Sequence, residues 1–354
     1  MEASERHLSV ADGSSGSDDR AAEVAAAQPA PTSLRIELYD ADGRDATVSL
    51  EQIDPAAIGE RQLLWIDLQG DDDALLTAIA QRLSLPPVVL DSLRSLGGKP
   101  VLENFGGWFY IQAVAVLHTG SMAFNGLVLG LVVGPNCVFT VHREAIPFLE
   151  ALRERERADT ELGVLSAESF AASLLDWQLA TYFEGVSAFE DAVDRLEVNL
   201  LGGPVSRDAL PELLQLRRAS SRLRRMLSLH RPVFNAMARP DFRPASNQDT
   251  DGNYQSLNAH FERATNAVEN ARDLVVGSFE LFTTRTAQRT NDTMKVLTFF
   301  TVLLGSLAVV AGVLGMNFAA PFFDSGMRGF WIAIGSMAAI AVLAMLVARW
   351  RDWL

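Results

Sequence analysis

The sequence predicts an α+β domain of mixed strands and helices, followed by long helices and a two-helix membrane hairpin at the C-terminus. Alternating apolar runs separated by turn residues occupy residues 33–143 and indicate strands with intervening helices. Beyond residue 143 the strand patterns stop and helical periodicity takes over. Two uncharged runs of 19 residues, Val296–Leu314 and Phe330–Ala348, are each long enough to cross a bilayer.

Composition limits the classes of function. The formal net charge of −14 over 354 residues argues against nucleic-acid binding, which needs a basic surface. The only cysteine, Cys137, can form neither an intrachain disulfide nor a thiolate zinc cluster, so we expect a buried structural thiol in a cytoplasmic domain. Residues 1–32 are rich in Ala, Ser, Asp, Glu and Pro and lack the apolar core of a signal peptide, so they predict a disordered acidic tail.

Residues 33–143 predict the α/β domain. The expected strands are Leu34–Tyr39, Thr47–Leu50, Leu63–Leu68, Trp108–Leu117, Gly126–Val133 and Cys137–Val141. The expected helices are Ala74–Leu83, which follows the capping cluster at 71–73, and Pro86–Leu96. The Gly-Pro-Asn sequence at 134–136 is typical of a hairpin turn.

Residues 144–253 predict a helical region, with helices at Ala145–Arg157, Ser166–Leu200 and Arg207–Ala238. The second of these helices is acidic on its exposed positions and the third is basic. We therefore expect these two to pack as an antiparallel pair. A basic amphipathic helix lying on anionic lipid is the alternative.

Residues 254–314 predict one helix that continues from a polar stalk into the first membrane span. No proline interrupts the chain between Tyr254 and Pro321, and apolar residues recur every three or four positions. At 1.5 Å per residue such a helix is about 90 Å long.

The charges around the two spans predict their orientation. Arg285, Arg289 and Lys295 precede the first span, and two arginines follow the second within residues 349–354. The positive-inside rule therefore places both termini in the cytoplasm of a cell (inner) membrane protein and the loop at 315–329 outside. A pair of buried core helices is the disfavoured alternative, because both runs are apolar on every side.

Two spans cannot enclose a pore, so a conducting protein needs several copies around one axis. One side of the first span carries small or weakly polar residues, namely Thr298, Thr301, Gly305, Ala308 and Gly312. Such residues suit either helix–helix packing or a path for water.

The start and end of the first span resemble the pore helix of the CorA family of divalent metal-ion transporters. The start reads Asn-Asp-Thr-Met-Lys-Val-Leu-Thr from Asn291, and the end is Gly315-Met316-Asn317. The resemblance implies a funnel-shaped homopentamer with an α/β/α cytoplasmic domain and a pore-lining first span. It also implies that the axis is lined by Asn291, Met294, Leu297, Thr301, Gly305, Ala308 and Gly312.

The resemblance implies a role for each part of the pore. Met294 and Leu297 would form apolar rings that gate by dewetting, and Asn291 and Thr301 would offer oxygen acceptors to a hydrated ion. Asn317 would form a selective ring at the outer mouth, with Gly315 allowing a tight turn and Met316 packing between subunits. The expected cargo is a divalent cation, Mg²⁺ first and Co²⁺ or Ni²⁺ next, with no bound cofactor.

Two alternatives remain open. The residues after the motif, Phe318–Phe323, are neutral, and this favours a ZntB-like zinc transporter, with or without proton coupling, as the second interpretation. A membrane-anchored scaffold or enzyme is the third, but the sequence has no nucleophile elbow, HExxH motif or paired histidines. The expected partners are therefore further copies of the chain, divalent ions and the lipid bilayer.

Overall fold

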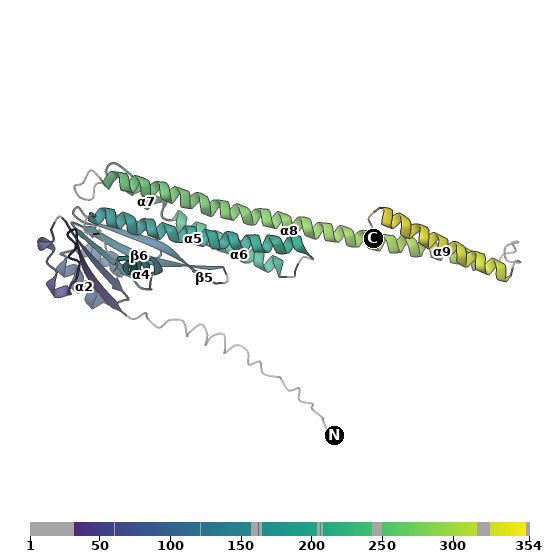
Figure 1. Ribbon diagram of the computed structural model, residues 1–354, viewed down its shortest axis with the longest axis horizontal. Helices are drawn as coiled ribbons and strands as arrows, with labels where there is room; N and C mark the ends of the chain where they lie inside the picture. Colours follow the sequence, from purple (N-terminus) through teal and green to yellow (C-terminus); the bar gives the residue numbers. More distant parts are fainter. Residues whose placement is uncertain are drawn as a thin grey trace, which may run out of the picture. The chain divides into compact units, whose positions relative to one another are not determined.

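The computed structural model describes residues 32–59, 61–120, 122–156, 162, 165–203, 206, 208–242, 250–316 and 326–351 (Figure 1). The chain divides into two compact units. Within the described part, the first unit comprises the residues up to 190 together with 215–272, and the second comprises 191–214 together with 273–351.

A seven-stranded sheet forms the centre of the first unit, with strand order β2-β1-β3-β7-β6-β5-β4. The strands are β1 (Ser33–Asp40), β2 (Ala46–Thr47), β3 (Gln62–Gln69), β4 (Val101–Asn104), β5 (Phe109–Thr119), β6 (Ala123–Gly134) and β7 (Cys137–His142). The β3–β7 pair is parallel, and the other neighbouring pairs are antiparallel. Two 3-10 turns, η1 (Leu50–Gln52) and η2 (Pro55–Ala57), lie between β2 and β3.

Helices cover both faces of this sheet. On one face α2 (Asp73–Arg82) and α3 (Pro87–Arg94) pack over a buried apolar cluster that includes Ile66 of β3 and Phe139 of β7. These two residues are register partners and therefore point to the same side. On the other face, Trp65 makes an edge-on ring contact with Phe170, with the two centroids 5.2 Å apart. The α/β/α layering implied by the family resemblance is thus present in this unit.

Local chemistry explains the ends of these elements. The Asp72 carboxylate accepts hydrogen bonds from the backbone N–H groups of Ala74 and Leu75 and begins α2. The β6–β7 turn places Asn136 at a positive φ of 51°, which asparagine tolerates better than most residues. A side chain at Gly134 would collide with the Trp108 ring, 2.2 Å from the position of its Cβ.

Two strand predictions need correction. The strand expected at Thr47–Leu50 ends at Thr47, because Ser49 begins the 3-10 turn and its backbone N–H bonds to the side chain of Gln52. The short edge strand β4 was not predicted from the sequence. Only four residues long and partly exposed, it has little alternation to reveal it.

Helices make up the rest of the described chain. They are α4 (Pro147–Glu156), α5 (Ala167–Gly202), α6 (Ala209–Ser228), α7 (Arg231–Met237), α8 (Thr250–Leu314) and α9 (Met327–Trp350). The single helix expected over Arg207–Ala238 is wrong, because it divides into α6 and α7. Pro232 causes the break, since proline has no N–H and its ring clashes with the carbonyl four residues earlier.

The α5–α6 contact is apolar rather than ionic. A Cβ at Gly185 of α5 would lie 3.6 Å from Leu223 Cδ2 of α6. Over the residues that the structure describes, no ion pair joins these two helices. The opposite charges predicted that α5 and α6 lie side by side, but buried leucines stabilise the contact between them.

The second unit contains both apolar runs. The first run forms the C-terminal part of the uninterrupted 65-residue helix α8, and the second forms α9. In their apolar windows, 6% and 0% of the residues are buried. Core helices of a soluble protein would be largely buried, so this exposure removes that alternative.

Candidate functional site

The residues expected to line a pore share one exposed side of α8. At about 100° per residue, they fall within an arc of roughly 120° around the helix axis. We call this set the α8 arc; its members are Asn291, Met294, Leu297, Thr301, Gly305, Ala308 and Gly312. All seven are exposed. A helix in a single chain therefore leaves a continuous face without an intramolecular partner.

The polar members of the α8 arc present oxygen atoms. The Thr301 hydroxyl donates to the Leu297 carbonyl at 2.8 Å, which leaves its lone pairs directed away from the helix. Asn291 adds an amide about three turns earlier. Water molecules around a cation donate outward, so these acceptors suit a hydrated ion.

The apolar members of the α8 arc lie between those two oxygen sites. Met294 and Leu297 are 54% and 58% exposed. From Gly305 to Gly312 the arc carries only small residues, so other helices can approach closely there.

The structure describes two residues of the Gly-Met-Asn motif. The Gly315 N–H donates to Ala311 O at 2.9 Å, and Gly315 is not among the described residues with positive φ. The chain turns at Gly315 directly after α8 ends at Leu314, and the tight turn expected of this residue stays a prediction. Met316 is 57% exposed. Asn317 lies outside the described residues.

The α8 arc continues toward the N-terminus beyond the residues chosen from the sequence. Thr283, Ala287 and Thr290 fall on the same side. Together with Phe282, Thr286, Asn291 and Met294 they line a groove of about 560 Å³. Extending the three-to-four-residue spacing backward from Asn291 and Met294 would have identified them in the sequence.

A metal site within one chain is not evident. In the described ranges, no three His, Cys, Asp or Glu side chains converge on one point. Described histidines have structural partners: His142 bonds Asp67, His230 bonds Val114, and His260 pairs with Asp176. Cys137 is buried, and burial raises the pKa of its thiol to about 12, in agreement with a structural role.

Comparison with known proteins identifies the family. Residues 60–349 match the family described as CorA-like Mg2+ transporter protein. The chain belongs to this family. The cobalt/magnesium transport protein CorA of Thermotoga maritima is 24% identical over 295 residues, covering 82% of this chain and 83% of that protein.

Solved structures agree on the fold of this CorA-family chain. The complete structure of the CorA magnesium transporter from Methanocaldococcus jannaschii superposes with a TM-score of 0.72 at 19% identity, covering 91% of this chain and 98% of that one. The ZntB cytoplasmic domain from Vibrio parahaemolyticus is more distant, with a TM-score of 0.56 at 10% identity over 72% of this chain and 99% of that one. With two exposed apolar helices, the chain is a membrane protein of the CorA family.

Proposed function

We propose that this protein is a homo-oligomeric channel or transporter for divalent cations, with Mg²⁺ as the first candidate cargo. The observation that supports this proposal is the α8 arc. Two large apolar residues between two oxygen acceptors, followed by a stretch of small residues, lie along the exposed side of one helix. The protein is a transporter rather than an enzyme.

Several copies must build the conducting path, because two spans cannot surround one. We infer a funnel-shaped homopentamer in which α8 from each copy turns its arc toward the central axis. Exposure of the arc in one chain supports this arrangement, since an unpartnered side is available to other copies.

Selection would occur where the first span ends. Mg²⁺ gives up its water shell reluctantly and usually keeps several waters when bound. A ring of Asn317 amide oxygens can therefore accept hydrogen bonds from a hydrated ion without the cost of stripping it. Met294 and Leu297 would close the other end of the pore by excluding water from a narrow apolar ring.

The proposed orientation places both termini in the cytoplasm of the cell (inner) membrane. The cations beside the spans support it, namely Arg285, Arg289 and Lys295 before the first span and Arg349 and Arg351 after the second. A potential of 100 mV, negative inside, then favours entry of a divalent ion by about 4.6 kcal/mol.

Zinc transport is the second candidate. The loop after Asn317 is neutral until Asp324, so it lacks the acidic stretch that would concentrate cations at the mouth. Proton-dependent Zn²⁺ uptake would favour this alternative. The test is competition among Mg²⁺, Co²⁺, Ni²⁺ and Zn²⁺ with and without a pH gradient.

The decisive variant is Asn317→Ala, assayed for metal uptake by reconstituted protein. We expect uptake to fall at least tenfold while the oligomer keeps its size, because loss of one amide per chain removes the whole ring. Asn317→Gln keeps the amide and serves as the matched control. Unchanged uptake by Asn317→Ala would refute the role of this residue.

A further inference from the structure

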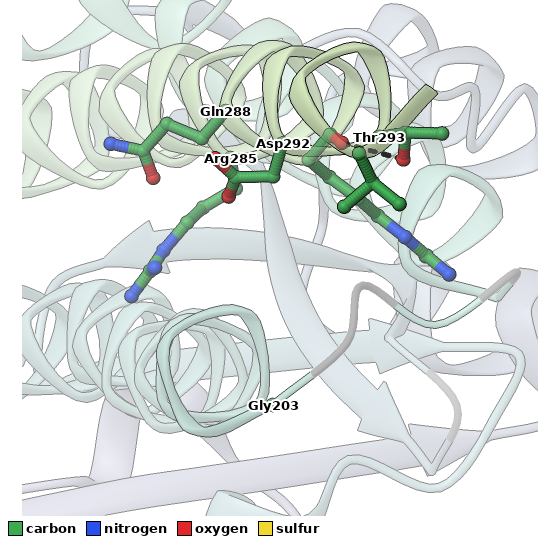
Figure 2. Close-up of a pocket in the computed structure, with 7 residues that line it drawn as sticks. Gly203, Arg285, Gln288, Asp292 and Thr293 are labelled. Carbon is green, nitrogen blue, oxygen red and sulfur yellow. Dashed lines mark hydrogen bonds between the residues drawn. The ribbon is translucent and has the colours of Figure 1, made fainter. Parts of the chain in front are cut away.

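A basic pocket lies on α8 immediately before the first membrane span (Figure 2). It has a volume of about 510 Å³ and is formed by α8 and the chain just after α5. The lining residues are Gly203, Arg285, Gln288, Arg289, Asp292, Thr293 and Val296. Figure 2 shows Arg285 reaching from α8 toward the end of α5, next to Gly203.

The lining carries a net positive charge. Arg285 donates one hydrogen bond, at 3.2 Å, to the carbonyl of Leu201 and keeps its other donors. Arg289 is exposed, and no described side chain forms an ion pair with it. Asp292 is the only acidic lining residue, and Lys295 neutralises it at 2.9 Å. The pocket thus attracts an anion.

The pocket lies on the side of α8 opposite the α8 arc. At about 100° per residue, Arg285, Arg289 and Val296 project roughly 140° to 180° away from the centre of the arc. If the arc faces the axis of an oligomer, as proposed above, this side faces away from the axis. Lipid can then reach it.

The lining changes from charged to apolar along the helix. Val296 is the first residue of the apolar run, and Phe300, one turn further on the same side, is 50% exposed. A ligand that fills the pocket and continues along α8 therefore needs an anionic group next to a hydrocarbon chain.

We infer that this pocket binds the phosphate headgroup of an anionic phospholipid from the leaflet next to the start of the first span. The Arg289 guanidinium donates to the phosphate, Arg285 supplies a second cation, and an acyl chain lies against Val296 and Phe300. Basic residues just outside a membrane span are a recurrent way to bind anionic lipids. The assignment rests on the proposed orientation of the arc, but it concerns a surface outside the pore.

Retained lipid tests the inference directly. The full-length oligomer is taken from nanodiscs of phosphatidylglycerol and phosphatidylcholine in equal parts, and the lipids that remain bound are counted by native mass spectrometry. We expect the wild type to retain phosphatidylglycerol preferentially. Arg289→Gln should lower this preference about fivefold, as expected for one cation beside an anionic membrane. Arg289→Lys should keep most of it.

Two further variants separate the pocket from general charge and folding effects. Gly203→Phe fills the pocket without changing its charge, and a Cβ at Gly203 would have no neighbour within 4 Å. We therefore expect this variant to lose the preference for phosphatidylglycerol as Arg289→Gln does. Arg272→Gln removes an exposed arginine of α8 about 26 Å away, and it should retain the wild-type preference. Oligomer size confirms that each variant assembles.

Three results would overturn the inference. The first is equal retention of the two lipids by the wild type. The second is a loss of phosphatidylglycerol preference in Arg272→Gln as large as that in Arg289→Gln. The third is full displacement of phosphatidylglycerol by millimolar inorganic phosphate. The last result would identify a soluble anion as the ligand. The Asn317→Ala variant should keep the lipid preference whatever its uptake, so failure of the lipid site and failure of the transport proposal are distinguishable.

Discussion

His230 bonds to the edge of β5 that faces away from β6, at a point where β4 no longer pairs with it. β4 pairs with β5 only as far as Gln112. Beyond that point the Val114 N–H donates to His230 Nε2 at 2.9 Å, and the Val114 carbonyl accepts from Gln178 and Tyr182. Because Nε2 accepts a hydrogen bond, the ring proton is on Nδ1, which donates to the Met226 carbonyl at 3.0 Å. His230 is therefore neutral in the folded protein.

The neutral state of His230 predicts acid sensitivity of the first unit. Burial lowers the pKa of His230 from 6.5 to about 4. The folded state then binds fewer protons than the unfolded state, so the stability that this residue contributes is complete above pH 6.5 and is lost as the pH falls toward 4. The expected loss is about 3 kcal/mol. Melting followed by intrinsic fluorescence from pH 7.5 to 4 measures it.

Two histidine variants control this measurement. His230→Gln should reduce the decline in melting temperature between pH 6.5 and 4, since glutamine does not titrate. His118→Gln changes an exposed histidine and should leave the decline as in the wild type. An unaltered decline in His230→Gln would show that another group is responsible.

A second buried polar cluster explains why one acidic residue of β3 is tolerated inside the sheet layers. The Asp67 carboxylate accepts hydrogen bonds from Thr140, His142 and Arg153. Burial alone would raise the pKa of Asp67, but the hydrogen bond from His142 and the charges of His142 and Arg153 hold it below its ordinary value. Only the three-dimensional structure reveals this cluster, because its members are up to 86 residues apart in sequence.

At the scale of elements, the strength of the local pattern determined what could be predicted. β5 and β6 are long, mostly apolar runs, and both were predicted within a few residues of their ends. The break between α6 and α7 was missed because the apolar spacing continues through it, although Pro232 was a visible signal. β4 is only four residues long and partly exposed, so its residues show almost no periodic pattern, although its partner β5 follows directly in the chain.

The length of α8 yields a prediction about its interior glycine. Gly277 is exposed in the middle of the helix, and a Cβ there would meet nothing within 4 Å. Gly277→Ala should therefore stabilise the protein by about 1 kcal/mol, because alanine loses less backbone entropy in a helix. Thermal melting measures the gain.

Gly185→Ala is the comparison for that prediction. Gly185 also lies inside a helix, but its Cβ would be 3.4 Å from the Phe124 ring, so we expect a smaller gain or a loss. A destabilised or disassembled Gly277→Ala oligomer would contradict the prediction and would indicate close packing of another copy against Gly277.

At the scale of the whole molecule, the sequence predicted which residues share the α8 arc but not what completes the site. The family resemblance selected the seven residues, and helical periodicity then places them on one side of α8. An ion path needs groups from several chains, and one chain shows no convergent metal ligands among its described residues. Periodicity also cannot determine the geometry of residues after the helix ends, where Asn317 lies.

The orientation of the molecule in the membrane can be tested with single cysteines. Cys137 is 1% exposed, and burial raises the pKa of its thiol to about 12, so the wild type should not react with a membrane-impermeant maleimide. Asp324→Cys in the loop between the spans should be labelled in intact cells, because the positive-inside rule places that loop outside. Arg351→Cys, after the second span, should be labelled only when the cells are permeabilised. The reverse pattern would invert the proposed orientation, and the membrane potential would then oppose cation passage from the Gly-Met-Asn end.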